Sequence, residues 1–91
     1  MILSDKYMVS EISGNYAAIP VGQSVVDAGK MVSLNKTSSF ICEYLKEEHT
    51  LDELLTALYE KFECTEADKK VVSRDTINFL NAAKTIGLIL E

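Results

Sequence analysis

The stretch VVDAGKMVSLNKTSSFI, Val25 to Ile41, changes its pattern halfway along. β-Branched residues lead into the turn residues Asp27-Ala28-Gly29, and an extended run continues to Leu34. From Asn35 onward the apolar residues recur with helical spacing. The stretch therefore predicts a short strand that ends directly at the start of a helix.

Two more strands precede this one. Residues rich in strand formers occupy 6–12 and 16–20, and Ser13-Gly14-Asn15 between them has the composition of a tight turn. With a third strand over 30–34, the first part of the chain predicts a three-stranded antiparallel sheet.

The rest of the chain has a helical pattern. Three helices are expected, over residues 37–47, 50–62 and 66–86. Asn35 is placed to cap the first helix, Thr50 and Glu53 form a capping box for the second, and Thr65 is an N-cap for the third. Gly87 suits the C′ position that ends the last helix.

Three strands followed by three helices form an α+β fold in which the helices cover one face of the sheet. The last two helices are separated by only a few residues, which favours a winged helix-turn-helix-like arrangement. With 91 residues, the chain is expected to be a single domain, 1–91.

Composition excludes several classes of protein. Apolar residues make up 47% of the chain and charged residues 25%, which is typical of a folded domain. The sequence contains no long apolar run and no signal peptide, so we expect a cytoplasmic protein without membrane association. The net charge of −5 argues against general affinity for nucleic acid.

The residues that usually carry catalysis are sparse. Cys42 and Cys64 are too few and too far apart for a zinc site and are expected to be small buried or half-buried hydrophobes. His49 lies in a polar loop and is expected to be solvated, and the four glycines stand singly rather than in a phosphate loop. The sequence predicts neither an enzyme nor a metal or cofactor site.

Binding of a peptide or protein is favoured instead. An edge strand beside a helix forms a groove in which an extended peptide can add as another strand. The strand over 30–34 is the candidate edge. Two alternatives stay open: a winged-helix DNA-binding or regulatory protein, suggested by cations on the last helix, and a structural adaptor that binds another protein through its helices.

The ordered combination of segments resembles the PqqD family of RiPP recognition elements, which act on ribosomally synthesised and post-translationally modified peptides. The segments that carry this resemblance are SDKYMVSEI, NYAAIPVG, VSLNKTSSFICEYL, TLDELLTALYEKFE and NFLNAAKTIGLI. The most telling piece is Leu34-Asn35-Lys36-Thr37 followed by an aromatic and aliphatic helix. The similarity extends from about Ser4 to Leu90.

This resemblance implies a non-catalytic peptide chaperone. Family members bind the leader segment of a precursor peptide as an added strand and present it to a modifying enzyme, often a radical SAM protein. The implied edge residues are Lys30, Met31, Val32, Ser33 and Leu34. The implied helix wall consists of Val71, Arg74, Asp75, Asn78 and Ala82. Lys70 and Arg74 are expected to pair with acidic leader residues, and the exposed strand edge leaves a homodimer open.

Overall fold

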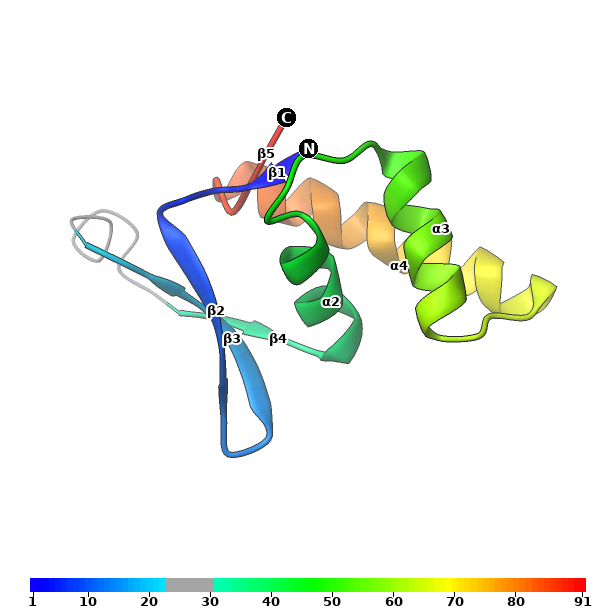
Figure 1. Ribbon diagram of the computed structural model, residues 1–91, viewed down its shortest axis with the longest axis horizontal. Coiled ribbons are helices and arrows are strands. Elements are labelled where there is room, and N and C mark those ends of the chain that lie inside the picture. The colour runs from blue at the N-terminus through cyan, green and yellow to red at the C-terminus, as the bar shows by residue number, and fades with distance from the viewer. Residues whose placement is uncertain (23–30) are drawn as a thin grey trace.

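The computed structural model describes residues 1–22 and 31–91, and the fold class is confirmed: a three-stranded antiparallel sheet is followed by three helices. The sheet contains β2 (Tyr7–Ile12), β3 (Asn15–Pro20) and β4 (Val32–Leu34) in the order β2-β3-β4. The helices are α2 (Lys36–Tyr44), α3 (Leu51–Lys61) and α4 (Glu66–Thr85). Figure 1 shows the β2–β3 hairpin projecting to one side of the helices.

The hairpin is built around a two-residue turn. Ile12 is opposite Asn15 in the register, so Ser13 and Gly14 form the loop. Both have positive φ, 53° and 82°, which is the conformation of a type I′ turn. This turn matches the right-handed twist of the strands and fixes the register of the hairpin.

The two faces of the sheet differ. Ala18 and Leu34 belong to the buried core, and Val9 and Val32 pack against it from neighbouring strands. Side chains alternate between the faces of a strand, and Met8 on the opposite face is 51% exposed. The inner face of the sheet therefore packs on the helices, as expected for this fold class.

All three helices begin with a capping box. Asn35, Thr50 and Thr65 are the N-caps, and each side chain accepts from the backbone N–H three residues later. The first helix is shorter than expected: Leu45 is its C-cap, so residues 46 and 47 lie outside it. The acidic residues Glu47 and Glu48 follow this end, where negative charge opposes the helix dipole.

Gly87 ends α4 as expected. Its φ is 78°, the Gly87 N–H donates to the Lys84 carbonyl at 3.2 Å, and the Leu88 N–H donates to the Ala83 carbonyl at 2.9 Å. This pair of bonds is a Schellman motif. It turns the chain back so that Leu88 and Ile89 lie in the core at 0% and 1% exposure.

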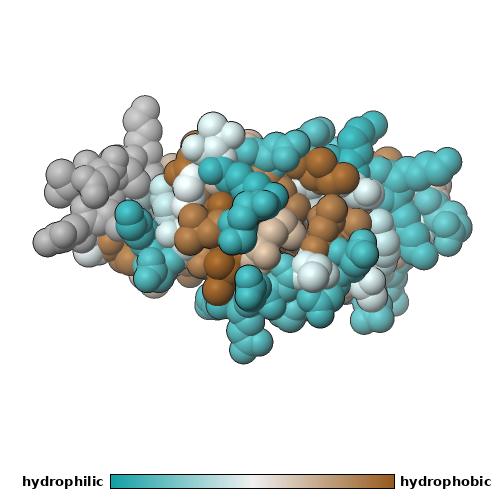
Figure 2. Space-filling view, turned by 90° about the horizontal axis from the view of Figure 1, so that it is seen from above, coloured by the Kyte–Doolittle hydropathy of each residue, from teal (hydrophilic) through white to brown (hydrophobic). Residues whose placement is uncertain are grey.

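Two short strands were missed by the sequence patterns. β1 (Ile2–Leu3) pairs antiparallel with β5 (Ile89–Leu90), and Figure 1 shows the two chain ends side by side at this pair. In the view of Figure 2, hydrophobic atoms gather over the middle of the face that carries the chain ends. A pair of two-residue strands has no periodicity to read, so only the tertiary structure shows it.

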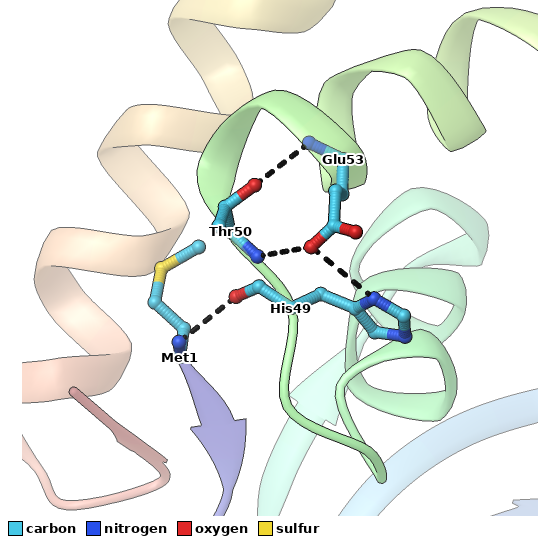
Figure 3. Close-up of polar contacts among 4 residues, drawn as sticks. All are labelled: Met1, His49, Thr50 and Glu53. Carbon is cyan, nitrogen blue, oxygen red and sulfur yellow. Dashed lines mark hydrogen bonds and ion pairs between the residues drawn. The ribbon is translucent and has the colours of Figure 1, made fainter.

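The loop between α2 and α3 is fixed by the start of the chain (Figure 3). Met1 and His49 exchange two backbone hydrogen bonds of 2.9 and 3.0 Å. The Thr50 N–H donates to the Glu53 carboxylate and lowers its pKa. The ring of His49, expected to be solvated, instead stacks on Tyr44 with centroids 4.0 Å apart, because the Met1 pairing holds the loop against α2.

The cysteines are free. Cys42 is fully buried, and this burial, reinforced by the charge of Glu43, raises the pKa of its thiol to about 12. Cys64 is half-buried. Both therefore fill space in the way expected from the sequence.

Candidate functional site

The edge of the sheet at β4 is open. β4 pairs with β3 through the register Tyr16–Leu34, Ala17–Ser33 and Ala18–Val32. Within the described part of the chain, no strand pairs with its other side. The backbone N–H and C=O groups on that side, called the open edge here, are free to form hydrogen bonds with another chain.

A cleft lies beside this edge. Its volume is about 270 Å³, and it extends from the end of β4 across the first turn of α2 to the middle of α4. We call it the β4–α4 cleft. Its lining residues are Ser33, Asn35, Thr37, Ser38, Ile41, Val72, Asp75, Thr76 and Phe79.

One face of α4 forms the wall of the cleft. Val72, Asp75, Thr76 and Phe79 are spaced three and four residues apart, so they lie on neighbouring turns of the same face. Val72 and Phe79 are half-buried, and Ile41 of α2 is only 1% exposed. The cleft therefore has an apolar base between two helices.

Asn35 determines how β4 meets α2. Its backbone is extended, with φ −92° and ψ −177°, so the strand conformation continues to the residue that caps the helix. Its side-chain oxygen accepts from the Ser38 N–H at 2.8 Å, and its own N–H donates to the Ser38 hydroxyl at 2.9 Å. This reciprocal pair fixes the open edge relative to the cleft with no intervening loop.

The polar side chains of the cleft differ in whether they have a hydrogen-bond partner. Those of Asn35 and Ser38 are hydrogen-bonded to each other's backbone in the capping box. Thr76 is 1% exposed, and its hydroxyl is the only buried side-chain polar atom without a hydrogen-bond partner among the described residues. Among the described residues of the lining, only Asp75 is ionisable. An unpaired hydroxyl and a carboxylate are thus adjacent along one wall.

The sequence was compared with models of known protein families. Residues 8–89 match the family described as Coenzyme PQQ synthesis protein D (PqqD). The chain belongs to the PqqD family. The match spans β2, β3, β4 and all three helices, and it confirms the resemblance seen in the sequence. The PqqD family comprises peptide-binding partners in the synthesis of coenzyme PQQ.

No curated protein and no solved structure gave a significant match to the chain. The winged-helix likeness therefore stays a prediction. Within residues 1–22 and 31–91, no three His, Cys, Asp or Glu residues are grouped in a way that could hold a metal ion. In the same ranges, no helix has the length and apolar character that crossing a membrane requires.

The structure describes four of the five edge residues implied by the PqqD resemblance. Lys30 lies outside the described residues. Met31 is 58% exposed just before β4, and Ser33 is exposed and lines the cleft. Val32 is half-buried and Leu34 is 7% exposed, and both pack on the core. The side chains of Val32 and Leu34 hold the sheet in place, whereas their backbone belongs to the edge strand.

Only one residue of the implied helix wall, Asp75, lines the cleft. The other four are exposed and lie outside the lining, namely Val71, Arg74, Asn78 and Ala82. Lys70 is also exposed and outside the lining. Rotation by 100° per residue places Lys70 and Arg74 on the side of α4 away from Val72 and Phe79.

The predicted wall did not include Val72, Thr76 and Phe79, because it was drawn only from residues of the helix that point away from the core. Val72 and Phe79 are half-buried, so their side chains contact both the core and the cleft. Val72, Asp75, Thr76 and Phe79 show this spacing in the sequence. A search for polar residues inside an apolar helical stripe would have found Asp75 and Thr76 together.

Proposed function

We propose that this protein binds the leader segment of a ribosomally made precursor peptide by β-strand addition and presents it to a modifying enzyme such as a radical SAM protein. The observation that carries the proposal is the open edge of β4 beside the β4–α4 cleft. The protein itself acts without catalysis, as a single domain in the cytoplasm.

Two kinds of contact support this function. Backbone hydrogen bonds from the open edge give a guest strand its registration, and alternate guest side chains reach the cleft. The apolar base formed by Ile41, Val72 and Phe79 offers area that is removed from water when a guest side chain enters. Recognition therefore combines a sequence-independent part and a selective part.

DNA binding has less support. A helix that reads DNA needs cations facing the duplex, and Lys70 and Arg74 of α4 are exposed. Glu66, Asp68 and Asp75 are on the same helix, and the chain carries a net charge of −5. These carboxylates would repel a phosphate backbone.

The proposal is tested by titrating the isotope-labelled protein with the leader segment of the precursor peptide encoded beside its gene. Backbone amide shifts are expected at residues 31–34 and at 72–79, because the guest adds beside both. A scrambled peptide of the same composition is the control. Shifts centred on α3, or none at high micromolar peptide, would refute the proposal.

N-methylation of the guest separates strand addition from other modes of binding. In a β-ladder, successive N–H groups of a strand point to opposite sides. Leader peptides methylated at one backbone nitrogen each should lose affinity at alternating positions. Equal tolerance at every position would exclude pairing with the open edge.

A further inference from the structure

The β4–α4 cleft carries charge of one sign. Of its nine lining residues among the described ones, three are apolar, five are neutral and polar, and only Asp75 is ionisable. Within residues 1–22 and 31–91, no lysine or arginine is part of the lining. An acidic guest side chain would meet this carboxylate without a compensating cation from the described lining, so the cleft disfavours acidic residues.

The cations of α4 do not neutralise the cleft. Arg74 Nε lies 3.5 Å from Asp75 Oδ1, but the two side chains are 69% and 61% exposed. Such a pair between adjacent exposed residues is weak and is screened by salt. Lys69 pairs with Glu66 instead. Asp75 is therefore available to a cation that approaches along the cleft.

Thr76 gives an independent indication of the kind of guest side chain that enters the cleft. Its hydroxyl is buried without a partner in the described structure, although buried polar groups are nearly always hydrogen-bonded. It lines the same cleft as Asp75 and follows it directly in the chain. A purely aliphatic guest would leave this hydroxyl unpaired and would cover the carboxylate without compensation.

We propose that the cleft selects a long basic side chain, lysine or arginine, in the leader segment. Its methylene groups lie on Ile41, Val72 and Phe79, and its head group donates to the Asp75 carboxylate and the Thr76 hydroxyl. A basic side chain suits this lining because it has an apolar stem and a head with several donors. This inference rests on the proposed function and reverses the charge expected from Lys70 and Arg74.

The test begins with selection from a randomised peptide library displayed on mRNA. The wild-type protein should enrich peptides with lysine or arginine at one position. The charge-reversed variant Asp75→Lys should enrich aspartate or glutamate there. Enriched peptides without a basic position would overturn this inference while leaving leader binding intact. Failure to enrich any peptide would overturn the proposed function as well.

A double-mutant cycle then links the guest cation to Asp75. Replacing the basic residue of one enriched peptide by methionine should weaken its binding to the wild-type protein about tenfold, a typical size for a close charge pair. The same replacement should have little effect on Asp75→Asn. Asp52→Asn on α3 removes an equal charge from an exposed position and should behave as wild type.

Thr76→Val tests the hydroxyl separately. It keeps the shape of the side chain and should weaken binding of the basic peptide about threefold to tenfold. Binding of the methionine peptide should not change. Equal affinities of both peptides for the wild-type protein would contradict the inference. Because Asp75 is exposed, the Asp75→Asn comparison tests the guest cation independently of Thr76.

Discussion

The environment of Thr76 is unfavourable for the stability of the free protein. Its side chain is 1% exposed and its hydroxyl has no partner in the described part of the chain. Ser38, a buried polar residue of the same cleft, is instead hydrogen-bonded to Asn35. A group that costs stability in the free protein is expected where a ligand supplies its partner.

Replacing Thr76 by valine should therefore stabilise the free protein. We expect the free energy of unfolding to rise by about 1 kcal/mol, because the buried hydroxyl is removed at constant shape. Urea denaturation measures this change. Thr56→Val at an exposed position of α3 is the matched control and should change little. A loss of stability in Thr76→Val would show that the hydroxyl is paired.

Cys42 predicts a dependence of stability on pH. Burial raises the pKa of its thiol from 9.0 to about 12, so the folded protein keeps a proton that the unfolded chain releases above about pH 9. The contribution of Cys42 is present below that pH and is lost as the pH rises toward 12. Wild type should lose up to about 1.4 kcal/mol per pH unit more than Cys42→Ala over this interval. Unfolding curves measured at several pH values give this difference. Parallel curves for wild type and Cys42→Ala would contradict the prediction.

The N-caps of α2 and α4 differ in their position relative to β4. Asn35 caps α2 and is also the residue that directly follows β4, whereas Thr65 caps α4 at a loop far from the open edge in the chain. Both form capping boxes of the same geometry. Their local contributions to stability should therefore be similar, and their effects on the site should differ.

Asn35→Ala and Thr65→Ala form a matched pair. Each should lower the free energy of unfolding by about 1 kcal/mol. Only Asn35→Ala should weaken leader binding, because it loosens the junction that holds the open edge against the cleft. Denaturation and peptide titration of both variants measure the two effects. Equal binding by the two variants would mean that the Asn35 junction does not position the edge.

Local signals in the sequence were sufficient for the elements that depend on a few neighbouring residues. The capping boxes, the Ser13-Gly14 turn and the C′ glycine each specify their own conformation. The first helix ends early because loop contacts with Met1 compete with it, and β1 and β5 exist through pairing between the two ends of the chain. Such long-range contacts leave no periodic pattern.

The site was harder to predict than the fold. The edge strand follows from the order of the sheet, but the face of α4 that lines the cleft depends on the packing angle between helices. Val72 and Phe79 have the spacing of core residues and also form the wall. Asp75 was expected at the wall and lies there, and Thr76 became visible only when its burial was known.

The two ends of the chain connect the helices to each other through backbone hydrogen bonds. The Ser4 N–H donates to the Leu88 carbonyl at 2.9 Å, and the Leu3 N–H donates to the Leu45 carbonyl at 2.6 Å. The β1–β5 pair is thus connected both to the end of α4 and to the end of α2. These contacts hold α2 and α4, the two helices that flank the cleft.

Alanine substitutions of Ile89 and Leu90, which are neighbours in β5, test how this strand packs. Ile89 is 1% exposed and Leu90 is 46% exposed. Ile89→Ala should cost about 2 to 5 kcal/mol through lost burial and a residual cavity, whereas Leu90→Ala should cost less than about 1 kcal/mol. Thermal or urea unfolding measures both. Similar losses in the two variants would contradict the placement of β5.

A leader segment that binds by strand addition becomes a fourth strand at the open edge of β4. Nuclear Overhauser contacts between the backbone protons of a bound leader peptide and those of residues 32–34 test this arrangement. We expect a ladder of contacts between successive guest residues and β4, at the spacing of paired strands. Contacts confined to side chains, or a ladder along β2 instead, would rule out strand addition at β4.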